Sequence, residues 1–363
     1  MAEDRTIRLA CHCGKHKYSF TVPVSSLPIK QRLCHCNISR RISGCLFTSY
    51  FAIPASNPPP DLTGLTEYKS SDILSRYFCS TCSTHLYCRY NDDGHFEASH
   101  GSVDGSTDDI FDFRAHGWIE DTKDGGASVW LKEYKGSPLS RWLIEWNQSP
   151  EVPLNWTSDH IEPTNKVSEQ ADEKLRVHCH CNGVEFFISR PSEDSFKASS
   201  PLPDLLVPYN SGQSAQNPEN KPWWLSTDHT KYLAGNCACR SCRMTTGFDI
   251  QQWAFIPAAG LSLANGKPFN LPFGTLRSYE SSTKPQRRIR WSCSRCGATV
   301  LWTGEERPTL IDVAAGLLDA PSGARAEEWL QWDLADRVSF KEDAHNTHLA
   351  DALEKGLVQW YIK

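Results

Sequence analysis

The sequence lacks the features that would assign the protein to a membrane, to the secretory pathway or to a nucleic acid. No segment of its 363 residues approaches the roughly 18 uncharged apolar residues of a membrane-spanning helix. The first ten residues, MAEDRTIRLA, carry acidic side chains where a signal peptide has a basic stretch followed by an apolar run. The net charge is only -5, so neither a broad basic face nor an acidic tail is expected. We therefore expect a cytoplasmic protein with no membrane or nucleic-acid partner.

Methionine and helical periodicity are also scarce. Two Met stand beside 13 Trp, 15 Phe and 11 Tyr, which favours a rigid aromatic core of the kind that accompanies β structure. The single good helical pattern covers residues 344–355, with Gly356 as its predicted stop signal. Short alternating or β-branched segments separated by Gly, Pro, Asn and Ser predict antiparallel strands. They cover residues 6–10, 17–22, 46–53, 85–90, 184–189, 252–256 and 299–303.

Cysteine, in contrast, is abundant. Fifteen thiols are an odd number, and in a reducing compartment so many favour metal ligands over disulfide partners. The spacing follows an order of CxC, a second CxC and CxxC, and this order then recurs. The pairs are Cys11/Cys13, Cys34/Cys36 and Cys79/Cys82, followed by Cys179/Cys181, Cys237/Cys239 extended by Cys242, and Cys293/Cys296.

The residues around the cysteines indicate a duplication. The segment CHCNISRRISGCLFTSYFAIP, residues 34–54, aligns without a gap on CACRSCRMTTGFDIQQWAFIP, residues 237–257. We therefore predict two domains, 1–148 and 175–363, joined by a polar linker at 149–174. Residues 198–223 have no counterpart in the first copy and are rich in Pro, Ser and Asn. They are interpreted as an inserted loop, either a lid over the neighbouring site or a surface excursion without a role.

The outer cysteines of each copy provide four thiolates, the ligand set of a closed structural zinc site. The predicted ligands are Cys11, Cys13, Cys79 and Cys82 in the first copy, and Cys179, Cys181, Cys293 and Cys296 in the second. Zinc binding of about 10 to 16 kcal/mol per site would tie the start of each module to its distant hairpin. The histidines beside cysteines are expected to be exposed rather than ligands or proton carriers; they are His12, His35, His178 and His180.

The central cysteines of the second copy form a different kind of cluster. Cys237, Cys239 and Cys242 are three thiolates without a fourth in the pattern. A metal held by three protein ligands can bind water, hydroxide or a substrate thiolate, whereas the alternative interpretation is an inert thiol cluster. In the first copy the third position is Ser39, a poor zinc ligand, so this site is predicted to be degenerate. Cys45 and Cys88 are expected to be buried thiols that pack as small hydrophobic residues.

This order of motifs, with an Arg directly after CxCxxC, a nearby Gly and a later Gly-to-Asp segment, resembles the glutathione-dependent formaldehyde-activating enzyme family. That family also contains centromere protein V. The resemblance covers about Leu9 to Asp104 and Val177 to Asp319. It implies a mainly β protein made of two tandem Mss4-like zinc-binding β modules. It also implies two structural zinc ions on the outer cysteines and one catalytic zinc ion on the central triad of the second copy.

The activity implied by the resemblance is that of a zinc-dependent carbon-sulfur lyase, similar to S-(hydroxymethyl)glutathione synthase. Cys237, Cys239 and Cys242 would be the catalytic residues, and glutathione or another thiol adduct the small-molecule substrate. Arg243 would hold a substrate carboxylate, or alternatively form a salt bridge within the fold. Two other functions stay open: a zinc enzyme of the same family repurposed for a tailoring step on a larger metabolite, and a non-catalytic zinc scaffold. The sequence fixes neither the general acid and base nor the oligomeric state.

Overall fold

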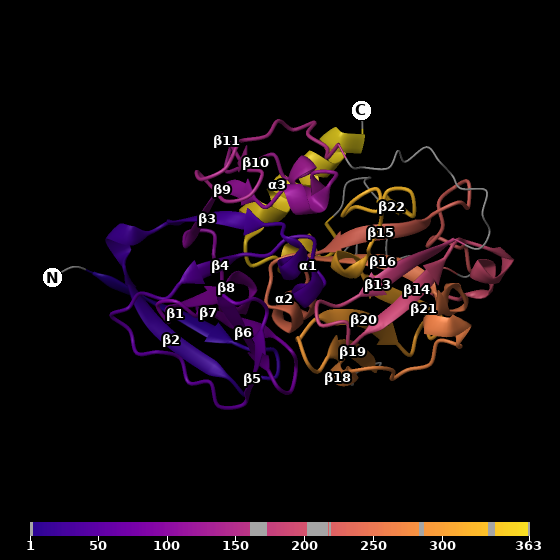
Figure 1. The fold of residues 1–363 in the computed structure, drawn as a ribbon, viewed down its shortest axis with the longest axis horizontal. Helices are drawn as coiled ribbons and strands as arrows, with labels where there is room; N and C mark the ends of the chain where they lie inside the picture. Colours follow the sequence, from indigo (N-terminus) through magenta and orange to yellow (C-terminus); the bar gives the residue numbers. More distant parts are fainter. Residues whose placement is uncertain are drawn as a thin grey trace.

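The computed structural model describes residues 3–159, 173–201, 217, 219–282, 287–332 and 338–361 (Figure 1). Strands dominate these residues and three α-helices occur among them, which confirms the predicted mainly β class. In the described residues no helix is both long and apolar enough to cross a membrane.

The first copy contains a five-stranded antiparallel sheet with the order β4-β8-β7-β6-β5. Beside it lie the hairpin β1–β2 and a parallel sheet with the order β12-β9-β3. Its elements are β1 (Asp4–Ala10), β2 (Lys17–Pro23), β3 (Ile29–Cys34), α1 (Asn37–Ser43), β4 (Tyr50–Ala52), β5 (Leu65–Lys69), β6 (Leu74–Cys79), β7 (His85–Tyr90), β8 (Phe96–Ser99), β9 (Phe111–Gly117), β10 (Glu133–Tyr134), β11 (Ser137–Pro138) and β12 (Ser140–Arg141). The strand predicted at 46–53 is shorter than expected, because Thr48 makes only an isolated bridge to Cys34.

The second copy is organised around a seven-stranded sheet with the order β18-β19-β20-β21-β16-β15-β22. A smaller sheet, β13-β14-β17, carries its first cysteine pair at the end of β13. Its elements are β13 (Lys174–His178), β14 (Glu185–Ser189), β15 (Tyr232–Cys237), α2 (Arg240–Thr246), β16 (Gln251–Pro257), β17 (Leu261–Ser262), β18 (Leu276–Ser282), β19 (Arg288–Cys293), β20 (Thr299–Gly304), β21 (Leu310–Ala314), β22 (Leu330–Trp332) and α3 (Thr347–Tyr361).

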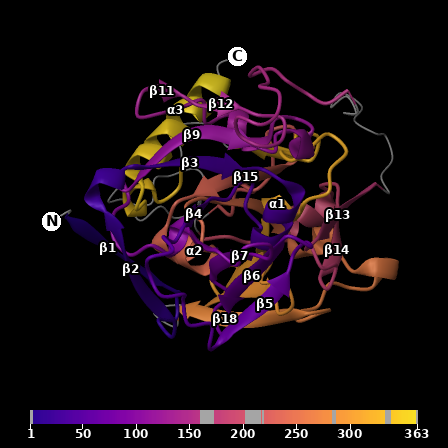
Figure 2. The same ribbon diagram turned by 60° about the vertical axis from the view of Figure 1, so that its left-hand side comes forward.

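The two copies interlock through reciprocal contacts between backbones. Helix α1 packs on the 3₁₀ turn η8 (Ala315–Leu317) of the second copy, and α2 packs on η2 (His100–Ser102) of the first. The amide of Gly316 donates to the Gly44 carbonyl and that of Gly101 to the Gly247 carbonyl, each at 2.9 Å. A Cβ on Gly316 would lie 2.3 Å from a carbonyl oxygen of the other copy, so this approach requires glycine. Both views place α1 and α2 at the centre of the molecule (Figures 1 and 2).

Helix α3 comes from the C-terminal end of the chain but packs against the first copy, close to β10 (Figure 1). Leu349, Leu353 and Leu357 form its buried face. The prediction that Gly356 ends this helix is wrong, because α3 continues through it to Tyr361. A Cβ on Gly356 would lie 1.4 Å from the Trp130 carbonyl oxygen. The glycine therefore serves close packing of the helix rather than its termination.

The predicted linker and inserted loop are described only at their ends. Residues 160–172 of the linker, and residues 202–216 and 218 of the loop, lie outside the described part. The start of the linker is attached to the first copy, since the amides of Val152 and Ser158 donate to the carbonyls of Arg141 and Lys123, each at 2.7 Å. The domain boundaries themselves stay a prediction.

Candidate metal centres

The outer cysteines of the first copy converge at one point. Cys11 and Cys13 follow β1, and Cys79 and Cys82 flank the turn after β6. Their four sulfur atoms lie within 4.8 Å of one another, with 3.4 Å between Cys11 and Cys13 and 3.7 Å between Cys13 and Cys79. Four thiolates at about 2.3 Å from a tetrahedral zinc ion are about 3.8 Å apart. The cluster therefore fits a closed zinc site.

The outer cysteines of the second copy have the same geometry. The sulfur of Cys181 lies 3.6 Å from that of Cys179 and 3.5 Å from that of Cys293, and Cys296 completes the group. Backbone amides point at three of these sulfurs at 3.4 Å, those of Gly183, Val184 and Arg295. Amides that donate to sulfur stabilise the thiolate form, which is the form that binds zinc.

The central triad is formed where β15 ends and α2 begins. Cys237 is the last residue of β15, Cys239 caps α2, and Cys242 lies in the first turn of the helix. Their sulfurs lie within 4.8 Å of one another, and the Cys242 amide donates to the Cys239 sulfur at 3.3 Å. No fourth His, Cys or carboxylate joins this group among the residues that the structure describes. The triad can hold a metal ion and leave part of its coordination free.

A buried arginine on β19 lies against the triad. Arg290 Nη1 donates to the Cys242 sulfur at 3.3 Å and Nη2 to Ser241 Oγ at 3.2 Å. The guanidinium also stacks over the Trp253 ring, 5.7 Å from its centroid. The pKa of Cys242 is held well below its usual range, first by hydrogen bonds from Cys237 and Cys239 and then by the charge of Arg290. Arg290 is not among the residues predicted from the sequence, although an arginine stands three residues before CxxC in both copies.

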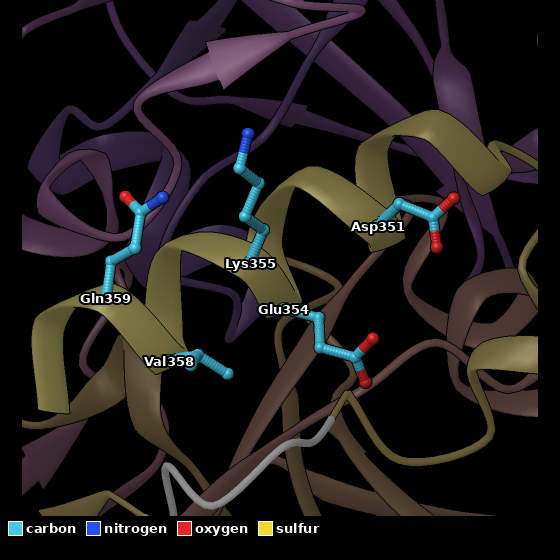
Figure 3. Close-up of a pocket in the computed structure, with 5 residues that line it drawn as sticks. All are labelled: Asp351, Glu354, Lys355, Val358 and Gln359. Carbon is cyan, nitrogen blue, oxygen red and sulfur yellow. The ribbon is translucent and has the colours of Figure 1, made fainter. Parts of the chain in front are cut away.

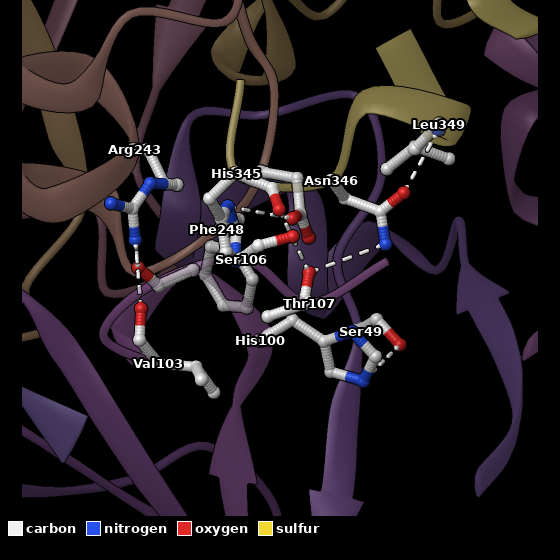
Figure 4. A network of polar contacts seen from close by, with 12 residues as sticks. Ser49, His100, Val103, Ser106, Thr107, Arg243, Phe248, His345, Asn346 and Leu349 are labelled. Atoms are coloured by element: carbon white, nitrogen blue, oxygen red, sulfur yellow. Dashed lines mark hydrogen bonds and ion pairs between the residues drawn. The ribbon is translucent and has the colours of Figure 1, made fainter. Parts of the chain in front are cut away.

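Arg243, the predicted carboxylate-binding residue, points away from the triad into the interface between the copies. Its Nη1 donates to the backbone carbonyls of Gly101 at 2.5 Å and Val103 at 3.1 Å, as Figure 4 shows for Val103. Burial lowers the pKa of its guanidinium to about 10. The structure thus gives Arg243 a role in joining the copies, and its contact with a substrate stays a prediction.

The first copy keeps the framework of the central site with one ligand changed. Cys34 ends β3 and Cys36 caps α1, as Cys237 and Cys239 do in the second copy. Ser39 takes the position of Cys242, and its hydroxyl lies 3.6 Å from the Cys34 sulfur. Arg76 takes the position of Arg290 and donates from Nη2 to Ser39 Oγ at 3.5 Å. Only two thiols remain, which are too few for either type of zinc site.

The other cysteines and the neighbouring histidines differ in their surroundings. Cys45 and Cys88 are buried, as predicted. The expectation that His35 is exposed is wrong, because its ring is fully buried and hydrogen-bonded to His116 at 2.9 Å. His12 and His180 are half-buried rather than exposed. They form reciprocal hydrogen bonds between the copies, to the hydroxyls of Tyr279 at 2.8 Å and Tyr68 at 2.6 Å.

A second polar cluster lies buried between the copies and contains Asp249 and His345 (Figure 4 shows His345). His345 Nδ1 lies 3.4 Å from Asp249 Oδ1, but neither atom makes a hydrogen bond to a described residue. Burial raises the pKa of Asp249 to about 6 and lowers that of His345 well below its usual range. The folded protein therefore favours the neutral form of both side chains more strongly than the unfolded chain does.

This cluster predicts an unusual pH dependence for Asp249→Asn. A raised folded-state pKa gives the carboxyl a stabilising contribution at low pH, which is lost as the pH rises through about 6. We expect the variant to be more stable than the wild type by about 2 kcal/mol at pH 8, with the difference shrinking toward pH 5. Urea denaturation at several pH values measures it. A difference that stays constant from pH 5 to pH 8 would contradict the assignment.

The hollow in Figure 3 lies on the outer face of α3, away from this chemistry. None of its lining residues belongs to a cysteine cluster. They are Asp351, Glu354, Lys355, Val358 and Gln359.

The fold and the three clusters define a two-copy β protein with cysteine groups that can bind zinc. The model of the glutathione-dependent formaldehyde-activating enzyme family matches residues 6–121 and 225–332, more than half of the chain. The chain belongs to this family and carries its module twice, which confirms the resemblance seen in the sequence. A search of curated proteins found no match. The second match begins after Cys179 and Cys181. The structure nevertheless places these two cysteines beside Cys293 and Cys296, which lie inside the match.

Proposed function

We propose that the protein is a zinc-dependent carbon-sulfur lyase with its active site at the triad of the second copy. The observation that carries the proposal is the convergence of Cys237, Cys239 and Cys242 without a fourth ligand, in a member of this family. The substrate would be an adduct between a small carbonyl compound and glutathione or another thiol. Glutathione would be the co-substrate when the adduct is formed rather than cleaved.

A zinc ion on the triad would offer an open position to a substrate thiolate or oxygen and stabilise negative charge there. The residues of the chain provide the surroundings. The Arg290 guanidinium offsets the charge of the thiolates and is held in place by Ser241. Trp253 is buried under that guanidinium and excludes water from one side of the pair. The positive guanidinium balances the negative thiolates, which supports a triad whose cysteines stay ionised although little water surrounds them.

The test is metal analysis combined with a screen of thiol adducts, S-(hydroxymethyl)glutathione first, on wild type and Cys242→Ser. We expect three zinc ions per chain in the wild type and two in the variant, with kcat/KM lower by at least about 100-fold. Cys88→Ala, which changes a buried thiol outside the clusters, serves as the control. It should keep three zinc ions per chain and the kcat/KM of the wild type.

Other results would point to the other functions. Two zinc ions in the wild type and no turnover of any adduct would favour the non-catalytic scaffold. Three zinc ions with turnover of larger conjugates alone would favour the repurposed enzyme. Unchanged turnover in Cys239→Ser together with a rise in Ser39→Cys would place the active site in the first copy instead.

A further inference from the structure

The degenerate site of the first copy retains two thiols that converge on one serine. Cys34 ends β3 and Cys36 caps α1, so a single residue separates the two cysteines. Ser39 contacts both of them, with its amide 3.3 Å from the Cys36 sulfur and its hydroxyl 3.6 Å from the Cys34 sulfur. The described residues place no third metal-ligating side chain in this group. The loss of the third cysteine therefore leaves a dithiol where the second copy has a metal-binding triad.

The dithiol is partly exposed and lies near a buried positive charge. Cys34 is partly exposed whereas its counterpart Cys237 is buried, and Cys36 is partly exposed like its counterpart Cys239. The guanidinium of Arg76 is buried beside Ser39, and its Nη1 has no hydrogen-bond partner among the described residues. This buried charge favours the thiolate form of the neighbouring Cys36 sulfur.

The two thiols also differ in acidity. The pKa of Cys36 is lowered to about 6, first by its interaction with the Cys34 side chain and further by Ser39 and the charge of Arg76. The same interaction raises the pKa of Cys34 well above its usual range. One sulfur is thus suited to attack as a thiolate, while its neighbour is held as a thiol until it is needed.

We propose that Cys34 and Cys36 form a redox-active dithiol that reacts with low-molecular-weight disulfides. The Cys36 thiolate attacks one sulfur of the disulfide, which forms a mixed disulfide and releases the first thiolate. Cys34 then loses its proton and attacks the Cys36 sulfur, which forms the Cys34–Cys36 disulfide and releases the second thiolate. The dithiol loses two electrons and two protons, and both end on the two thiols released. This reaction is independent of the proposed lyase activity.

The test uses the full-length, zinc-loaded protein and glutathione disulfide. After incubation at several ratios of glutathione to its disulfide, free thiols are alkylated and the peptides are identified by mass spectrometry. We expect a Cys34–Cys36 disulfide in the wild type with its zinc content unchanged. Cys34→Ser should trap glutathione on Cys36, whereas Cys36→Ser should show at least about tenfold less adduct on Cys34.

Ser39→Cys provides the matched comparison, because it restores the triad of the second copy in the first. We expect this variant to bind one additional zinc ion and to resist oxidation at Cys34 and Cys36. The proposal fails if both residues of the wild type stay reduced while the zinc content is constant. It also fails if the disulfide forms only after zinc is lost, or if Cys36→Ser itself removes a zinc ion. The measurement on the wild type tests the proposal even if a variant fails to fold.

Discussion

Replacing Cys293 by serine is expected to remove one zinc ion and unfold the second copy. Cys293 lies 3.5 Å from Cys181, and Thr275 Oγ1 lies 3.0 Å from its sulfur. The cluster joins the turn after β13 to the β19–β20 hairpin, segments that are 112 residues apart in sequence. A structural zinc ion contributes about 10 to 16 kcal/mol, as much as the whole stability of a typical domain. We therefore expect no cooperative urea transition from the second copy in circular dichroism.

The control for this prediction is again Cys88→Ala. It removes a buried thiol of the first copy that belongs to no cluster, so we expect a loss of about 1 kcal/mol and an unchanged zinc content. If Cys293→Ser keeps the zinc content and the urea midpoint of the wild type, the tetrad of the second copy is not a zinc site. Removal of zinc from the wild type by a chelator should reproduce the loss of structure.

Gly356→Ala is expected to detach α3 from the first copy, although alanine favours a helix over glycine by about 1 kcal/mol. The new Cβ would overlap the Trp130 carbonyl oxygen, at 1.4 Å, and this oxygen is a backbone atom rather than the end of a flexible side chain. The helix must therefore shift and expose part of its buried leucine face. We expect a net loss of about 3 kcal/mol in the free energy of unfolding and faster hydrogen exchange in α3.

The control variant is Gln359→Ala, on the exposed side of the same helix. It distinguishes an effect of packing on stability from an effect of helix propensity. Gln359 accepts one hydrogen bond from Lys132 at 3.2 Å and lies in the open hollow of Figure 3. Its replacement should change stability by less than about 0.5 kcal/mol. If Gly356→Ala stabilises the protein, as a propensity effect alone would, then α3 does not pack on Trp130 as described.

The cysteine clusters could be predicted from the sequence because their pattern is local and repeated. Each CxC or CxxC pair places two sulfurs in one turn, and the recurrence of the order shows which pairs belong to one module. Arg290 and Arg76 were within reach of the same reasoning, since both precede CxxC by three residues. They were missed because a single charged residue within a strand has no spacing of its own.

The contacts between the copies could not be predicted in this way. Gly101 and Gly316 are required by the backbone of the other copy. A Cβ would lie 2.4 Å from the Phe248 amide nitrogen at Gly101 and 2.3 Å from the Cys45 carbonyl oxygen at Gly316. The same applies to Gly356, because a glycine late in a helical pattern usually signals its end. The Arg243 guanidinium is likewise directed by carbonyls of the other copy. In each case the local sequence allows more than one conformation or contact, and residues of the other copy determine which one forms.

The reciprocal interface has a consequence for how the two sites can change. Paired contacts of the kind made by His12 with Tyr279 and by His180 with Tyr68 are those of a two-fold symmetric dimer. In a dimer of identical chains, every substitution occurs in both halves at once. Here the halves share one chain, so a serine at position 39 alters one centre while the other keeps its three thiols. Fusion thus lets one half specialise while the shared interface keeps both halves folded.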